Sequence, residues 1–75
     1  METYLCRING EKYFFDYADP QYNATTKSYS GVARFWKEDC EEQKDTVSFY
    51  TKEDEVDLTH QKIQEQIEKK VNLDK

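Results

Sequence analysis

The sequence predicts an α+β fold in which a four-stranded antiparallel sheet, made of an N-terminal β-hairpin and a second β-hairpin, carries one C-terminal amphipathic helix on one face. Three observations predict it: an Asn-Gly pair between two alternating segments, two later segments with a period of two, and a stripe of aliphatic residues every four positions near the end. The 75 residues form one domain, 1–75, because a second core would need a longer chain.

The strongest local signal is a β-hairpin with strands at about 3–8 and 11–17. Asn9-Gly10 supplies the two positive φ angles of a type I′ turn. A two-residue loop fixes the register, which puts Leu5 opposite Phe14 on one face. The pairs Ile8–Glu11, Cys6–Tyr13 and Tyr4–Phe15 then lie on the other face, which we expect to be buried.

The centre of the chain alternates less regularly. Residues 18–28 contain Pro20 and are predicted to be a loop. The sequence leaves open whether this loop carries a short edge strand. Gly31 is expected to be a bulge or a strand-entry turn before a strand at about 32–37, and a further strand follows at about 46–51. Alternation leaves open which face of these two strands is buried, because the 32–34–36 and 33–35 sets both contain apolar residues.

A helix is predicted over residues 59–72. Leu58 and Ile63 flank a cap at Thr59 with the spacing of a hydrophobic staple, and Ile67 and Val71 continue the apolar stripe. A single narrow stripe covers only one face of a sheet. We therefore expect a two-layer structure whose uncovered face presents Leu5 and Phe14.

Acidic charge is concentrated in the second half of the chain. Residues 1–37 hold five Lys and Arg against four Asp and Glu, whereas residues 38–75 hold six against twelve, which gives +1 and −6 and the net charge of −5. This imbalance disfavours binding to a phosphate backbone and favours a basic partner. Two segments carry the excess, and we take them as candidate partner-binding sites: Glu38, Asp39, Glu41, Glu42 and Asp45, then Glu53, Asp54, Glu55 and Asp57.

These two segments have two interpretations. Their charge could imitate the spaced phosphates of a nucleic acid, which would suit an inhibitor of a nucleic-acid-binding protein. The simpler alternative is that both are solvated loops that keep a small protein soluble.

No arrangement typical of an enzyme or a metal site is apparent. His60 is the single histidine and fits an ordinary position in the first helical turn. Cys6 is expected in the core and Cys40 among acidic residues, and both environments disfavour a reactive thiolate. Zinc knuckles, an EF-hand loop and a Gly-rich phosphate loop are all missing. We expect no catalytic residues, no metal, no cofactor and two free thiols.

Two further expectations concern partners and location. A nucleic-acid-binding domain is the alternative function, with Arg7, Lys12, Arg34 and Lys37 beside aromatic residues of the sheet. Apolar runs are too short to span a bilayer, and the start Met-Glu-Thr-Tyr lacks the features of a signal peptide. We therefore expect a cytoplasmic chain with no membrane contact.

The leading hypothesis is a small, acidic, non-enzymatic protein-binding module. Its size, acidity and single α+β layout resemble those of the small inhibitors encoded by phages and mobile elements, including anti-CRISPR and antirestriction proteins. That resemblance implies a protein partner with a basic surface, in its sharpest form a nucleic-acid-handling protein. The candidate contact residues are the two acidic segments together with Leu5 and Phe14, and homodimerisation stays open.

Overall fold

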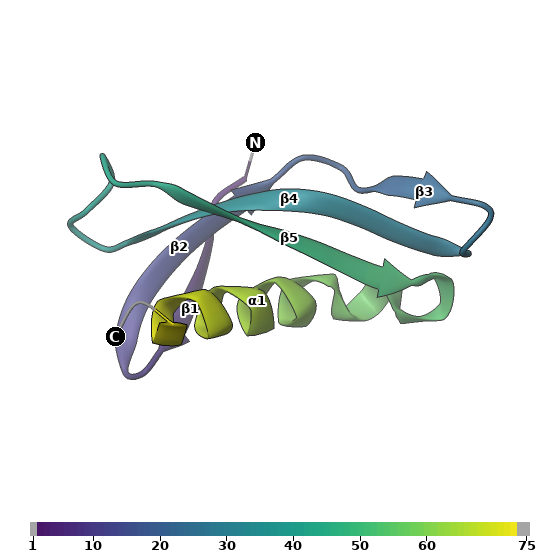
Figure 1. Cartoon of the computed structure of the whole chain (residues 1–75). Helices are drawn as coiled ribbons and strands as arrows, with labels where there is room; N and C mark the ends of the chain where they lie inside the picture. The colour runs from purple at the N-terminus through teal and green to yellow at the C-terminus, as the bar shows by residue number, and fades with distance from the viewer. Residues whose placement is uncertain (1, 74–75) are drawn as a thin grey trace.

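A computed structural model describes residues 2–73 as a twisted antiparallel sheet with one long helix packed on it (Figure 1). This confirms the predicted α+β class. The elements are β1 (Tyr4–Ile8), β2 (Glu11–Tyr17), β3 (Gln21–Asn23), β4 (Ser28–Lys37), β5 (Asp45–Lys52), the 3₁₀-helix η1 (Glu53–Leu58) and α1 (Thr59–Leu73).

Successive long strands are neighbours in the sheet. β1 pairs with β2, β2 with β4 and β4 with β5, while β3 pairs with the first residues of β4. Because β5 covers one side of β4 over the same residues, β2 and β3 must share the other side. From Tyr17 to Gln21 the chain advances four residues, but the partner strand advances three, from Ala33 to Ser30. The extra residue marks a bulge beside Pro20.

The N-terminal hairpin has the predicted register. Leu5 lies opposite Phe14 and Cys6 opposite Tyr13. Asn9 and Gly10 have φ values of 54° and 82°, as a type I′ turn requires. A two-residue loop leaves no slack, so this local signal alone determined the pairing.

The structure decides which face of β4 and β5 is buried. Ala33 and Phe35 point into the core with Val47 and Phe49, whereas Val32 is exposed. Residues 18–28 are not a continuous loop, because β3 and the beginning of β4 lie in this segment.

Gly31 lies inside β4, so the expected turn or bulge at this glycine is wrong. The ring of Phe49 lies over it, and a Cβ on Gly31 would stand 2.9 Å from the Phe49 Cζ atom. Position 31 is therefore glycine because a side chain would clash with Phe49, and not because the backbone adopts a conformation that favours glycine.

The helix packs through the predicted stripe. Ile63 and Ile67 are fully buried, and Val71 packs against the same core. Thr59 is not the N-cap: it has helical φ and ψ, and its hydroxyl donates to the Val56 carbonyl at 2.7 Å. The reason is that η1, expected as a charged loop, leads directly into α1.

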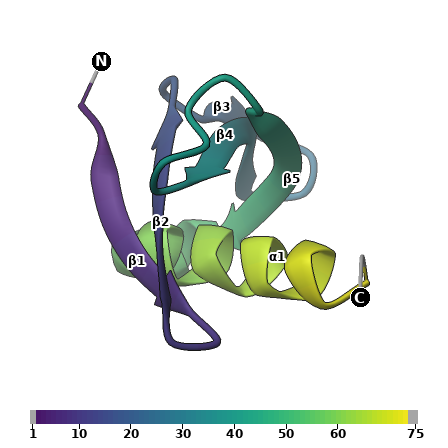
Figure 2. The ribbon, with the colours of Figure 1, turned by 90° about the vertical axis from the view of Figure 1, so that its left-hand side faces the viewer.

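The curvature of the sheet determines what the helix reaches. In Figure 2 the sheet curves like an arch, with the β1–β2 hairpin on one side and β5 on the other, and α1 runs across its open side. The helix contacts both β5 and β1. One face of the sheet is therefore covered by α1, and we call the other the outer face.

Candidate functional site

A row of three apolar side chains crosses the outer face. Leu5, Phe14 and Trp36 occupy successive positions on β1, β2 and β4. Leu5 is 53% exposed and Phe14 is half-buried, but Trp36 is buried because Phe14 packs beside it and the Lys44 ammonium lies 4.6 Å above its ring. Leu5 is thus exposed on the outer face and Phe14 is partly exposed there, as the sequence predicted.

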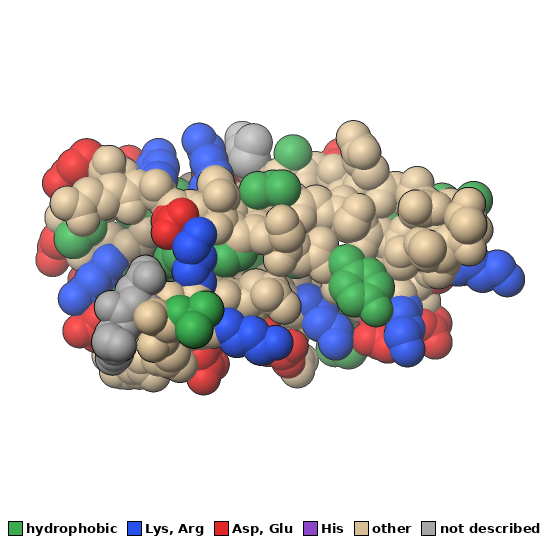
Figure 3. Space-filling model, viewed as in Figure 1, with side chains coloured by type: hydrophobic (Ala, Val, Ile, Leu, Met, Phe, Trp, Pro, Cys, Tyr) green, Lys and Arg blue, Asp and Glu red, His purple; other side chains and the backbone are tan. Residues whose placement is uncertain are grey.

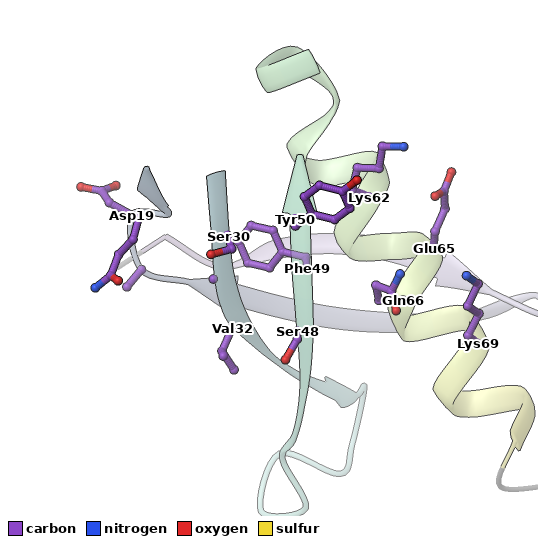
Figure 4. A pocket seen from close by; sticks show the side chains of 13 residues that line it. Asp19, Ser30, Val32, Ser48, Phe49, Tyr50, Lys62, Glu65, Gln66 and Lys69 are labelled. Atoms are coloured by element: carbon purple, nitrogen blue, oxygen red, sulfur yellow. The ribbon is translucent and has the colours of Figure 1, made fainter. Parts of the chain in front are cut away.

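Two other residues of the outer face are exposed: the sequence left the face of Val32 open, and it did not single out Tyr50. Val32 and Tyr50 are 56% and 59% exposed on β4 and β5. They line a shallow trough of about 930 Å³ between these strands and the flank of α1 (Figure 4). Lys62 and Lys69 project from the helix beside it, and Asp19 and Glu65 balance their charge. The trough therefore offers hydrogen bonds and apolar contact with no net charge.

An ion pair fastens β2 to β4 on the outer face. The Arg34 guanidinium donates two hydrogen bonds to Asp16, at 2.9 and 2.7 Å. Asp16 is buried, whereas the Arg34 side chain is about half exposed. The hydrogen bonds and charge of Asp16 raise the pKa of Arg34 above its ordinary value. Such planar, bidentate geometry is the strong form of this interaction.

The two acidic segments lie at opposite ends of β5. The first lies in the connection from β4 to β5 and reaches Asp45, the first residue of β5, and the second lies in η1 after β5. An eight-residue strand separates them by about 26 Å. In Figure 3 acidic and basic side chains are interspersed on the viewed face. The acidic residues thus form two separate groups, one at each end of the strand that the sequence predicted between them.

Two of the predicted acidic contact residues are engaged within the molecule. Asp45 accepts a hydrogen bond from the Lys70 ammonium at 3.0 Å, and Glu55 lies 3.6 Å from Lys62. Hydrogen bonding from Lys70, and then from the Thr46 amide, lowers the pKa of Asp45. Glu38, Asp39, Glu41, Glu42, Glu53, Asp54 and Asp57 are exposed.

The basic residues considered for nucleic-acid binding are also partly engaged. Arg34 pairs with Asp16, and Lys37 pairs with Glu11 at 2.9 Å. Arg7 and Lys12 stand opposite each other and are exposed. With Trp36 buried, this face offers few of the free rings and cations that base stacking needs.

A second group of aromatic residues lies where α1 begins, and sequence reasoning did not find it. The His60 Nε2 atom is 2.8 Å from the Tyr17 hydroxyl, and the Tyr4 ring lies 4.2 Å from the imidazole. A hollow of about 570 Å³ opens beside this group. Its lining residues are Tyr17, Asp19, Pro20, Tyr29, Val56, Asp57, Thr59 and His60. The sequence signal that could have indicated this group is the Asp19-Pro20 pair, which follows the end of the aromatic strand at Tyr17.

Both cysteines are free, as expected. Burial raises the pKa of the Cys6 thiol, and Cys40 is half-buried in the connection from β4 to β5. Within residues 2–73, no group of three or more His, Cys, Asp or Glu side chains is arranged to hold a metal ion.

In the part of the chain that the structure describes, no helix is long and apolar enough to cross a membrane. Comparison of the chain with protein-family models, with curated proteins and with solved structures finds no match. The fold and its surfaces therefore carry the functional argument.

Proposed function

We propose that this chain is a small, acidic, non-enzymatic protein-binding module that presents the outer face of its sheet to a partner with a basic surface. The observation that carries the proposal is the uncovered outer face, where Leu5, Val32 and Tyr50 are each more than half exposed. Large apolar side chains exposed together on one face are typical of interaction sites.

The placement of charge supports a protein partner. The outer face of β4 and β5 lies between the two acidic segments, so an apolar centre is flanked by charged ends, as in many interfaces. Exposed carboxylates at the ends attract a basic surface and speed the encounter. Leu5 and Phe14 add exposed apolar surface towards β1, on the other side of the Asp16–Arg34 pair.

In its sharper form, the proposal takes the partner to be a nucleic-acid-handling protein and the module to be an inhibitor of the kind encoded by phages and mobile elements. The excess of six negative charges in residues 38–75 supports it, because proteins that handle nucleic acids carry basic surfaces. The two free thiols support a reducing, cytoplasmic environment.

Two variants test the proposal by affinity capture from the native host, read out by mass spectrometry. The outer-face variant replaces Leu5, Val32 and Tyr50 by Gln, Thr and Gln, which keeps the strands polar and extended. The acidic variant replaces Glu38, Glu41 and Glu42 by Gln. It spares Asp45, because the Lys70 contact would confuse binding with stability.

The parent should retain one defined protein. We expect the outer-face variant to lose at least about 10-fold in affinity, which is the size of one interface hot spot. The acidic variant should lose less, and its loss should shrink as salt is raised, because exposed charges are screened. Addition of nucleic acid should release a nucleic-acid-handling partner.

Several results would contradict the proposal. Unchanged capture by both variants would remove the outer face and the acidic segments as contact surfaces. Salt-dependent binding of the isolated protein to generic DNA or RNA would favour the alternative function. A sedimentation experiment that shows a stable dimer, lost in the outer-face variant, would make a second copy the occupant of this face.

A further inference from the structure

The hollow beside Tyr17 and Tyr29, which we call the tyrosine hollow, is lined by apolar surfaces and carboxylates. It lies on the helix side of the sheet, away from the outer face, because Tyr17 and Tyr29 alternate in phase with the buried residues of β2 and β4. Tyr17 is held by hydrogen bonding to His60, and Tyr29 packs on Tyr22 with ring centroids 4.9 Å apart. Both rings are thus fixed before any ligand arrives.

The charge of the hollow has one sign. Asp19 and Asp57 line it, and its lining includes no Lys or Arg. Neither carboxylate forms a salt bridge with any other residue of the segment 2–73. The negative charge of Asp19 is felt at Tyr17, whose pKa is raised by burial first and then by this carboxylate. An anion would be repelled from this site.

Two features argue for an organic cation as the occupant. Aromatic faces attract cations through their ring quadrupoles, and this attraction adds to the pull of the carboxylates. Small hard metal cations instead require a shell of six or more oxygen ligands at short distance, and the walls here are largely rings, Pro20 and Val56. The positive end of α1 is a weaker opposing influence, since the Thr59 amide is already bonded to the Val56 carbonyl.

We propose that the tyrosine hollow binds the guanidinium or ammonium group of an arginine or lysine side chain presented by the protein partner. Tyr17 and Tyr29 supply the aromatic surfaces, and Asp19 and Asp57 supply the carboxylates. The identity of the source rests on the proposed function, but the recognition of the cation itself does not. The hollow is a second contact, on the helix side of the sheet, and it adjoins the trough at Asp19, which lines both.

The direct test titrates the ¹⁵N-labelled full chain with small probes and follows amide chemical shifts. The probes are N-acetyl-arginine amide and N-acetyl-lysine amide, with N-acetyl-citrulline amide as the uncharged match for arginine. The cationic probes should shift amides near positions 17–20, 29 and 56–60, and citrulline should bind at least about 3-fold more weakly.

Matched variants localise the effect. Tyr29→Leu and Asp57→Asn should each weaken the arginine probe about 2- to 5-fold, the range for one exposed cation–π contact or one exposed ion pair. Tyr50→Leu on the outer face and Asp39→Asn at the far end of β5 remove the same groups elsewhere and should leave the titration unchanged. Thermal melting must show that all four variants fold.

The inference is overturned if the cationic probes shift no amides around the hollow, if citrulline binds as tightly as arginine, or if the control variants weaken binding as much as the hollow variants. Capture experiments with the same variants test whether the cation comes from a side chain of the protein partner. Weaker capture by Tyr29→Leu and Asp57→Asn supports a partner side chain, whereas unchanged capture, with the probes still bound, overturns that source. Loss of capture in the outer-face variant alone leaves the proposed function standing without this inference.

Discussion

The two faces of the sheet are stabilised by different means. On the covered face, Phe15, Ile63 and Ile67 are fully buried against one another, so burial of apolar surface holds α1 in place. On the outer face, the planar Asp16–Arg34 pair and the Trp36 ring beneath Lys44 hold the strands together. Among residues 2–73 a single α-helix covers one face of the sheet, so side chains of the sheet itself must shield the other.

This difference separates stability from binding. Substitution of the buried residues of the covered face lowers the free energy of unfolding, whereas Leu5, Val32 and Tyr50 contribute little to the core. The exposed residues are therefore free to serve a partner. Single substitutions on each face test whether the covered face supplies stability and leaves the exposed residues free for binding.

The largest effect should follow removal of a helix anchor. Ile67→Ala should lower the free energy of unfolding by about 2–4 kcal/mol, because it leaves a cavity at the centre of the stripe that docks α1. Val32→Thr on the outer face is the control and should change it by less than about 0.5 kcal/mol. Urea titration measures both, and a loss below about 1 kcal/mol for Ile67→Ala would mean that the helix is not anchored here.

A substitution that adds a methyl group should also damage the covered face. Gly31→Ala places a Cβ about 2.9 Å from the Phe49 ring, and we expect a loss of about 1–3 kcal/mol from overpacking. A double-mutant cycle with Phe49→Leu checks the cause, because the smaller side chain should remove part of the penalty. Equal effects of Gly31→Ala in both backgrounds would contradict the proposed contact.

On the outer face, the two partners of the ion pair should differ. Arg34→Gln leaves the buried Asp16 carboxylate without its cation, and we expect a loss of about 1–2 kcal/mol, reduced because Arg34 is half exposed. Asp16→Asn should cost less, since water can solvate the released guanidinium. Thermal unfolding of both variants at neutral pH decides, and the reverse order would show that Asp16 is not sheltered.

The smallest effect concerns the Asp45–Lys70 contact between β5 and α1. Because the folded-state pKa of Asp45 lies below its ordinary value of 3.8, its stabilisation is present at neutral pH and is lost as pH falls through that range. Both side chains are substantially exposed, so Asp45→Asn should cost less than about 1 kcal/mol at pH 7. The parent and the variant should converge in stability as pH falls below that range, and a constant difference would contradict the assignment.

Local chemistry made part of this molecule predictable. Asn9-Gly10 fixed a hairpin register because few residues adopt two successive positive φ angles, and the four-residue spacing of Ile63, Ile67 and Val71 fixed the buried side of the helix. Leu5 and Phe14 followed from the same register. The acidic segments were found by composition, and the strand predicted at about 46–51 already separated them.

Local patterns in the sequence were enough to predict the α+β class, the first hairpin, the helix stripe and the excess of acid in the second half. Four features follow from the three-dimensional fold alone: the side of β4 that faces the core, the position of Phe49 over Gly31, the pairing of Asp16 with Arg34 and the contact of Tyr17 with His60. Periodicity and turn preference act between residues that are close in the sequence. The contacts of Asp16 with Arg34 and of Tyr17 with His60 join residues 18 and 43 positions apart, and these residues meet only when the curved sheet closes over its helix.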